Sequence, residues 1–171
     1  MAERKPRPEP TEEAESLERK LERAARDEVD RELRVSLLVA GGAPSQRYRF
    51  HFAADGSGRV RCELDCDLSD RKGKAGRRTL AQKEFADLVR AIVASGVLEV
   101  SAEQPRFVPD TVVGSLELSD GRSSLRWDFA ADPEQAKTQG AVPPPAVERA
   151  ADEIYSLGGR LMGKRTASVK P

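Results

Sequence analysis

The chain has 171 residues, of which 34% are charged and 38% are hydrophobic, and its 29 Lys and Arg residues balance its 29 Asp and Glu residues. It contains no run of about 18 apolar residues, which excludes a membrane-spanning helix, and its N-terminus lacks the apolar segment of a secretory signal. The zero net charge excludes a protein built wholly to coat nucleic acid. We therefore expect one domain with tails, located in the cytoplasm.

The first 34 residues predict an arm followed by a charged helix. Residues 1–10 contain three prolines among charges and are expected to be disordered. Residues 11–34 lack Gly and Pro and place acids four residues before arginines, as in the pair Glu15–Arg19, which favours a helix. This helix is either solvated or docked on a partner or a second copy of the chain. The residues of its thin apolar stripe are Leu17, Leu21, Val29 and Leu33.

Beyond residue 34 the apolar period changes from helical to two, which predicts three strands over 35–39, 47–53 and 60–68. Gly-rich turns separate them. A three-residue loop in the second turn pairs Phe52 with Val60 and places all large apolar side chains on one face.

Five cations occur within residues 71–78, which we predict to be a flexible basic loop: Arg71, Lys72, Lys74, Arg77 and Arg78. A helix with an apolar face follows from about residue 80 to 93. The strands 111–119 and 122–129 then flank Asp120-Gly121, which predicts a two-residue turn that pairs Gly114 with Trp127. After a loop that ends in three prolines, a last helix is expected over 146–157.

These elements predict an α+β fold. We expect an antiparallel sheet of four or five strands in the order β-β-β-α-β-β-α, with two helices packed on one face and the charged helix 11–34 preceding it. The single domain is predicted to span residues 35–159, and residues 160–171 to form a basic disordered tail.

Candidate chemical groups are few. His51, the single histidine, is expected on the polar strand face among arginines, where a cationic neighbourhood disfavours metal binding. An enzyme that uses His51 with Glu63 or Asp65 stays open only if a concave pocket encloses the imidazole. Cys62 and Cys66 are too far apart along a strand to bridge and are expected to be buried thiols. We predict no catalytic residue, no metal site and no cofactor.

The order of the elements resembles the emfourin-like family of small bacterial proteins, whose named member inhibits thermolysin-like metallopeptidases. The matching features are Val39-Ala40-Gly41-Gly42, the helix start Arg78-Thr79-Leu80, the segment Gly96–Val100, and the Asp120-Gly121 hairpin. The resemblance implies the same fold over residues 35–157. It carries over no inhibitory residue, because Ala43-Pro44 stand where the family has another glycine.

We therefore predict a non-catalytic protein-binding or accessory protein, either a subunit of a larger assembly or an emfourin-like peptidase inhibitor. Its candidate partner-binding residues are those of the apolar stripe and the basic loop: Leu17, Leu21, Val29, Leu33, Arg71, Lys72, Lys74, Arg77 and Arg78. The alternative is nucleic-acid contact through the basic residues 71–78 and the C-terminal tail. No aromatic side chain interleaves that run for base stacking, which weakens the alternative.

Overall fold

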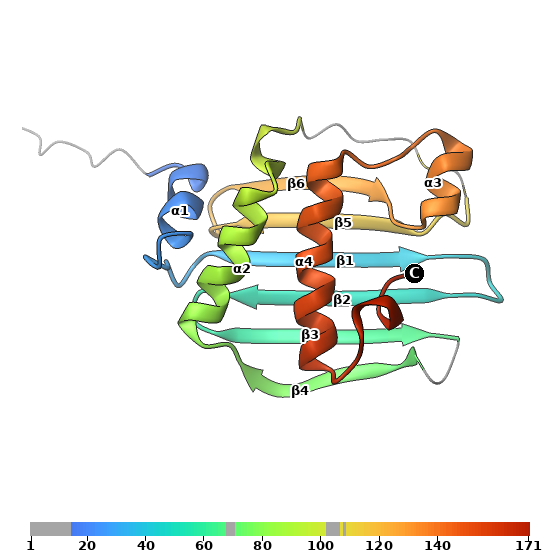
Figure 1. The fold of residues 1–171 in the computed structure, drawn as a ribbon, viewed down its shortest axis with the longest axis horizontal. Helices are drawn as coiled ribbons and strands as arrows, with labels where there is room; N and C mark the ends of the chain where they lie inside the picture. Colours follow the sequence, from blue (N-terminus) through green and yellow to red (C-terminus); the bar gives the residue numbers. More distant parts are fainter. Residues whose placement is uncertain (1–14, 68–70, 102–106, 108) are drawn as a thin grey trace, which may run out of the picture.

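A computed structural model describes residues 15–67, 71–101, 107 and 109–171, except for the side chain of Arg77. The predicted α+β fold is confirmed, with an antiparallel sheet in the strand order β4-β3-β2-β1-β5-β6 (Figure 1). The predicted disordered arm, residues 1–10, lies outside the described residues. The bounds of the six strands are β1 Arg34–Gly41, β2 Tyr48–Asp55, β3 Arg59–Cys66, β4 Gly73–Thr79, β5 Val113–Ser119 and β6 Ser124–Ala130.

Two long helices cross the same face of the sheet, and a short helix stands at each end of the molecule (Figure 1). Helix α1 packs beside α2, and α3 lies close to β6. No helix among the described residues is long and apolar enough to cross a membrane. The helical bounds are α1 Leu17–Ala24, α2 Gln82–Ala94, α3 Pro133–Gln139 and α4 Pro145–Leu161, with single 3-10 turns η2 Val97–Glu99 and η3 Thr166–Ser168.

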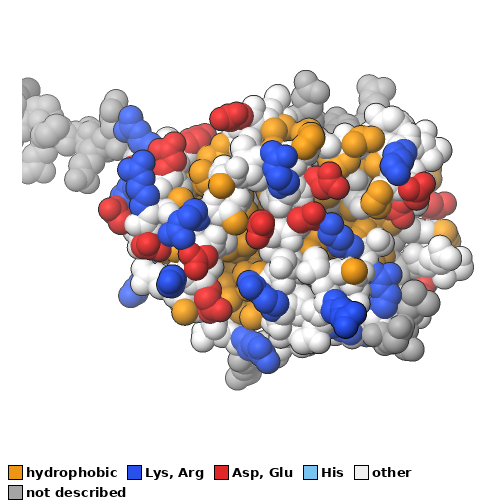
Figure 2. Space-filling view, in the orientation of Figure 1, with side chains coloured by type: hydrophobic (Ala, Val, Ile, Leu, Met, Phe, Trp, Pro, Cys, Tyr) orange, Lys and Arg blue, Asp and Glu red, His pale blue; other side chains and the backbone are white. Residues whose placement is uncertain are grey.

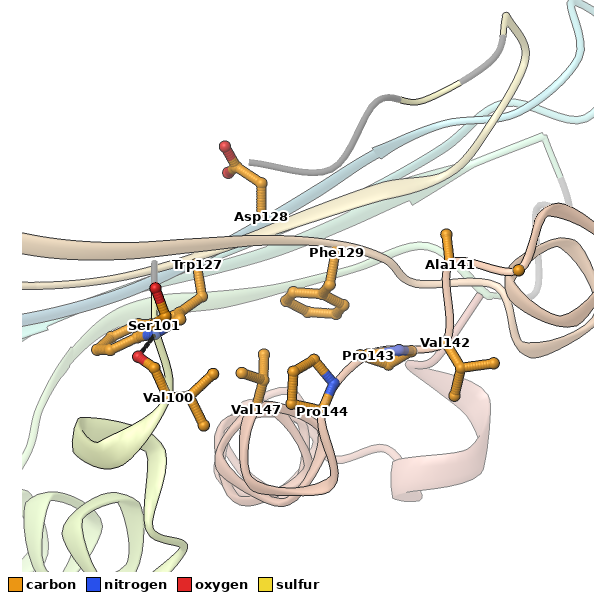
Figure 3. Close-up of a pocket in the computed structure, with 11 residues that line it drawn as sticks. Val100, Ser101, Trp127, Asp128, Phe129, Ala141, Val142, Pro143, Pro144 and Val147 are labelled. Atoms are coloured by element: carbon orange, nitrogen blue, oxygen red, sulfur yellow. Dashed lines mark hydrogen bonds between the residues drawn. The ribbon is translucent and has the colours of Figure 1, made fainter. Parts of the chain in front are cut away.

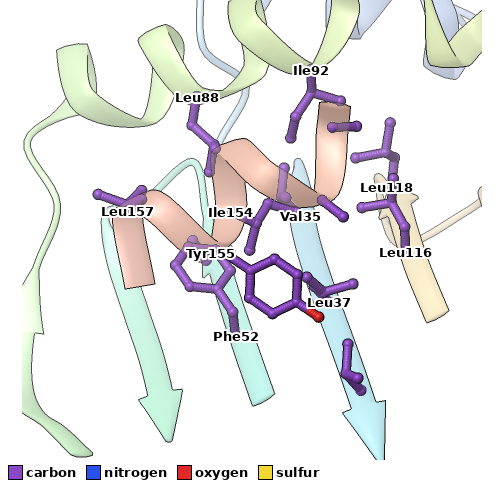
Figure 4. Close-up of a cluster of buried hydrophobic side chains, with 14 of the residues drawn as sticks. Val35, Leu37, Phe52, Leu88, Ile92, Leu116, Leu118, Ile154, Tyr155 and Leu157 are labelled. Atoms are coloured by element: carbon purple, nitrogen blue, oxygen red, sulfur yellow. The ribbon is translucent and has the colours of Figure 1, made fainter. Parts of the chain in front are cut away.

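The core lies between the sheet and the two long helices (Figure 4). Alternate strand residues point into it, so the period-two pattern of β1 to β3 correctly identifies the buried face. Helix α4 contributes Ile154 and Tyr155, and α2 contributes Leu88 and Ile92. Close packing of this kind makes each buried side chain sensitive to truncation.

The predicted count of four or five strands is wrong, because residues 73–79 form β4 rather than a flexible loop. Their sequence carries cations and glycines instead of alternating apolar residues, so no strand pattern is visible. As an edge strand β4 needs only Ala75 in the core, and its charged side chains keep the open edge from pairing with other chains. The predicted element order also lacks α3, whose residues read as loop.

The predicted helix over 11–34 is also too long. The structure has a helix only over Leu17–Ala24, and Asp27 then adopts a left-handed backbone with φ of 70°. Leu33 is fully buried immediately before β1. A continuous helix cannot deliver that side chain into the sheet, so the chain turns between the two elements.

Both hairpins keep the predicted faces but not the predicted register. Phe52 pairs with Cys62 instead of Val60, and Gly114 pairs with Phe129 instead of Trp127. Each shift is two residues, which leaves every side chain on its predicted face. Aspartates set the turns: the Asp120 carboxylate accepts the backbone N–H groups of Arg122 and Ser123, which closes a four-residue loop.

The C-terminal segment is folded, in contrast to the disordered tail predicted over 160–171. Helix α4 continues to Leu161, and Val169 is fully buried. The Tyr48 hydroxyl donates to the Val169 carbonyl, and the Arg71 guanidinium donates to the carbonyls of Ser168 and Lys170. Because α1 and this segment share the core of the sheet, the core extends beyond both predicted boundaries, at 35 and 159.

Replacing Arg71 by alanine is expected to loosen this segment, because the two carbonyls lose their shared donor. The free energy of unfolding should fall by about 1–2 kcal/mol. Hydrogen exchange should accelerate at the amides of Val169 and Lys170, which donate to the Thr166 carbonyl. Lys72→Ala, which removes an exposed neighbouring cation, is the control and should change neither quantity. Unchanged exchange in Arg71→Ala would show that the other contacts of the segment, such as Val169 burial and the Tyr48 hydrogen bond, hold it without Arg71.

Candidate protein-binding surface

The link between α3 and α4 is stiff and presents one apolar side chain to solvent. Asp132 caps α3 by accepting the backbone N–H groups of Glu134 and Gln135, and Gly140 ends it with φ of 63°. A run of three prolines follows, the last of which is the first residue of α4, one residue before the predicted start of that helix. Between glycine and prolines stands Val142, 62% exposed and the most exposed large hydrophobic residue described.

A hollow of about 480 Å³ lies on one side of this link, between the end of η2, strand β6 and the start of α4 (Figure 3). The Trp127 indole donates to the Val100 carbonyl at 3.0 Å, which fixes the ring and satisfies its polar atom. In Figure 3 Asp128 points away from the hollow. Ser101 and the apolar side chains of six residues form the walls: Val100, Trp127, Phe129, Pro143, Pro144 and Val147.

A second hollow of about 300 Å³ lies on the other side, between α3, α4 and the C-terminal segment. It shares Phe129, Val142 and Pro143 with the first, so the two hollows flank the Val142–Pro143 link. We call the link and both hollows the Val142 surface. Figure 2 shows hydrophobic side chains exposed in this region, near α3 and the N-terminal end of α4.

The wall shared by the two hollows depends on a glycine. Gly114 pairs with Phe129, and a Cβ at position 114 would come within 2.4 Å of the Phe129 ring. The sequence predicts that Gly114 makes room for a large ring across the strand, which is right, but assigns that ring to Trp127. The ring that lies against it is Phe129, which lines both hollows.

Four charged side chains are among those that line the second hollow: Lys137, Glu148, Asp152 and Lys170. Lys170 forms an ion pair with Asp152, and its ammonium group lies 5.9 Å from the centre of the Tyr155 ring. Lys137 pairs with Glu134 at 3.1 Å. Burial raises the pKa of the Tyr155 hydroxyl, so the phenol stays neutral. The other lining side chains are apolar, apart from the Tyr155 hydroxyl, and they suit an apolar group.

The apolar stripe predicted to bind a partner is instead part of the core of the chain. Leu17, Leu21 and Leu33 are 3%, 1% and 0% exposed, and Val29 is half-buried against the same cluster. These side chains are therefore already covered. The polar face of α1 remains exposed but has no apolar stripe.

The basic residues 71–78 are largely occupied as well. Lys72 lies 3.4 Å from Asp65, and Lys74 lies 3.2 Å from Glu63, both on β3. Arg71 holds the C-terminal segment, and Arg78 is exposed. The side chain of Arg77 lies outside the described residues. Neighbouring acids thus neutralise part of this predicted nucleic-acid contact.

The remaining candidates lie apart from the Val142 surface. His51 is half-buried on the opposite sheet face, and burial, then Arg61 and Arg49, lower its pKa. Cys62 and Cys66 are buried thiols outside any disulfide, as predicted, and burial raises the pKa of Cys62 to about 12. Within the described residues no group of three His, Cys, Asp or Glu side chains is placed to hold a metal ion.

No protein-family model matches the sequence, and no curated protein matches it. The function must therefore be argued from the site. Sequence reasoning missed the Val142 surface because its residues come from several separate segments. Its one local signal is an apolar valine between a helix-ending glycine and a proline run.

Proposed function

We propose that this protein is a non-catalytic binding protein that holds an apolar segment of another protein on the Val142 surface, as an accessory subunit or an inhibitor. The observation that supports the proposal is the exposure of Val142 between two apolar hollows. Exposed apolar surface flanked by such hollows is typical of protein-interaction sites.

The rigidity of the surface favours this function. The prolines before α4 restrict the backbone, and the hydrogen bond of Trp127 holds the indole in place. A preformed surface loses little conformational entropy when a partner binds. Side chains of Leu or Phe size in the partner would fill the hollows.

Replacing Val142 by arginine should weaken partner binding at least about tenfold, because burial of one valine contributes about 1.5–3 kcal/mol. The free energy of unfolding should change by less than about 0.5 kcal/mol, since the side chain is exposed. Leu38→Arg is the matched control, because Leu38 is 40% exposed on the opposite sheet face.

The measurement is quantitative co-purification of the tagged wild type and both variants from the native cells. One protein should be recovered in stoichiometric amount with the wild type and with Leu38→Arg, and be lost with Val142→Arg. Equal recovery with all three, or no stoichiometric protein with the wild type, would refute the proposal.

Inhibition of a peptidase, which the emfourin-like resemblance implies, is one form of this function and can be assayed separately. Wild-type protein should slow a thermolysin-like metallopeptidase, and Val142→Arg should not. If the wild type leaves the peptidase rate unchanged, the inhibitor version is rejected and the accessory-subunit version is judged by co-purification.

A further inference from the structure

The sheet face opposite α2 and α4 carries the outward-pointing residues of every strand, and they form rows across the sheet. One row places Arg61 beside Ala53, Ser36 and then Glu117. The next row places Arg34 between Asp55 and Ser119. The first row therefore has small side chains at its middle, whereas the second has Arg34 at its middle, beside the small side chain of Ser119.

This arrangement creates a shallow hollow of about 530 Å³. Its floor is formed by the small residues Ser36, Ala53 and Ser119, and the side chains of three arginines surround this floor. We call it the arginine hollow. Its principal lining residues are Arg34, Ser36, Ala53, Asp55, Arg59, Arg61, Glu117 and Ser119.

Two of the three arginines that line the arginine hollow form ion pairs. Arg59 pairs with Asp55 at 2.9 Å, and Arg61 pairs with Glu63 at 3.1 Å. Arg34 is exposed and forms no ion pair within the part of the chain that the structure describes. The hydroxyls of Ser36 and Ser119 likewise form no hydrogen bond among the described residues. One guanidinium and two hydroxyls thus remain free to donate.

The two acids that line the hollow differ in their contacts. The Asp55 carboxylate is 12% exposed and also accepts hydrogen bonds from Ser57. Glu117 stands opposite Arg126 of β6 in the sheet register, but Arg126 forms its ion pair with Asp128. The lining thus carries three arginines against two acids, and this excess of one positive charge favours an anion.

We infer that the arginine hollow binds carboxylate side chains of an acidic protein segment, as a second contact separate from the Val142 surface. Arginine binds carboxylates in a forked geometry, and the serine hydroxyls can donate from the floor. The inference rests on the proposed function only in taking the ligand to be a protein.

A nucleic acid fits this face less well. Tyr, Trp and Phe do not occur at its outward positions in the described strands, so bases have no stacking platform. Carboxylates on a peptide need no such platform.

The test is direct binding of a fluorescent hexaglutamate peptide to the full chain, followed by anisotropy. The wild type should bind, and raising the salt from about 20 to about 200 mM should weaken binding at least tenfold. Arg34→Gln and Arg61→Gln should each weaken it about tenfold, by loss of a charged hydrogen bond. Glu117→Gln should strengthen it, because an acid leaves the rim.

Arg49→Gln is the control, since Arg49 lies on the same face outside the lining of the hollow and should leave the dissociation constant within about twofold. Val142→Arg should also leave it unchanged, which separates this site from the proposed function. The inference is overturned by absence of peptide binding, by equal affinity in the arginine variants, by tighter binding of an oligothymidylate of equal length, or by displacement with equimolar inorganic phosphate.

Discussion

Replacing Leu21 by alanine is expected to lower the free energy of unfolding by about 3 kcal/mol. Leu21 is 1% exposed and belongs to the core cluster that includes Leu17 and Leu33. Its truncation removes a buried side chain and leaves a cavity that a shift of the short helix α1 can close only in part. Urea unfolding followed by circular dichroism measures the change.

The control for this prediction is Glu22→Ala on the same helix. Glu22 is exposed, and alanine is a good helix former, so its free energy of unfolding should stay within about 0.5 kcal/mol of the wild type. If Leu21→Ala is equally mild, the core does not need α1, and its apolar stripe would be available to a partner after all.

The difference between the predicted and the observed α1 shows which information a helical sequence pattern does not contain. Alternating acids and arginines correctly indicate a helix, and the apolar residues are correctly identified as one stripe. The pattern cannot say whether the chain itself or another molecule covers that stripe. Here α2 covers it, through packing between residues far apart in the sequence.

The strands of the sheet likewise fall into those that the sequence pattern predicts and one that it does not. Alternation predicts β1, β2, β3, β5 and β6 because both faces of these strands have a clear chemical identity. Strand β4 is not predicted because it lies at an edge and buries little, so its sequence is dominated by the cations Lys74, Arg77 and Arg78. The faces of the hairpins are predictable, but their registers depend on side-chain hydrogen bonds of Asp55 and Asp120.

The Val142 surface and the arginine hollow are harder still to predict. Each assembles residues from at least four segments, and the rows around Arg34 exist only once β1 lies between β2 and β5. Val142 and Arg34 are ordinary residues in the sequence. Their neighbours, which the fold supplies, make them candidates for binding.

Replacing Asp120 by alanine is expected to lower the free energy of unfolding by about 3 kcal/mol at pH 7. Asp120 is 2% exposed, and its carboxylate lies 2.8 Å from the Lys20 ammonium group. It also accepts the backbone N–H groups of Arg122 and Ser123 at 3.0 and 2.9 Å. The substitution therefore breaks the turn between β5 and β6 and the ion pair that joins it to α1.

The pH dependence of this effect distinguishes the charge from simple packing. The hydrogen bond from Lys20, followed by that from the Ser123 amide, holds the pKa of Asp120 well below its usual value. Because the pKa of Asp120 is lower in the folded than in the unfolded state, the ionised carboxylate stabilises the fold fully above the unfolded pKa of about 4. This stabilisation decreases as the pH falls from that value toward the folded-state pKa. Asp120→Asn should therefore be clearly less stable than the wild type at pH 7 and approach it near pH 2.

Urea unfolding of both proteins between pH 7 and pH 2 measures this convergence. Lys137→Ala, which removes an exposed partner of Glu134, is the control. Its free energy of unfolding should stay within about 0.5 kcal/mol of the wild-type value at every pH. If the curves of Asp120→Asn and the wild type also run parallel, the carboxylate charge does not hold the turn to α1. The hydrogen bonds to the turn backbone would then carry the whole effect, since a neutral amide oxygen can still accept them.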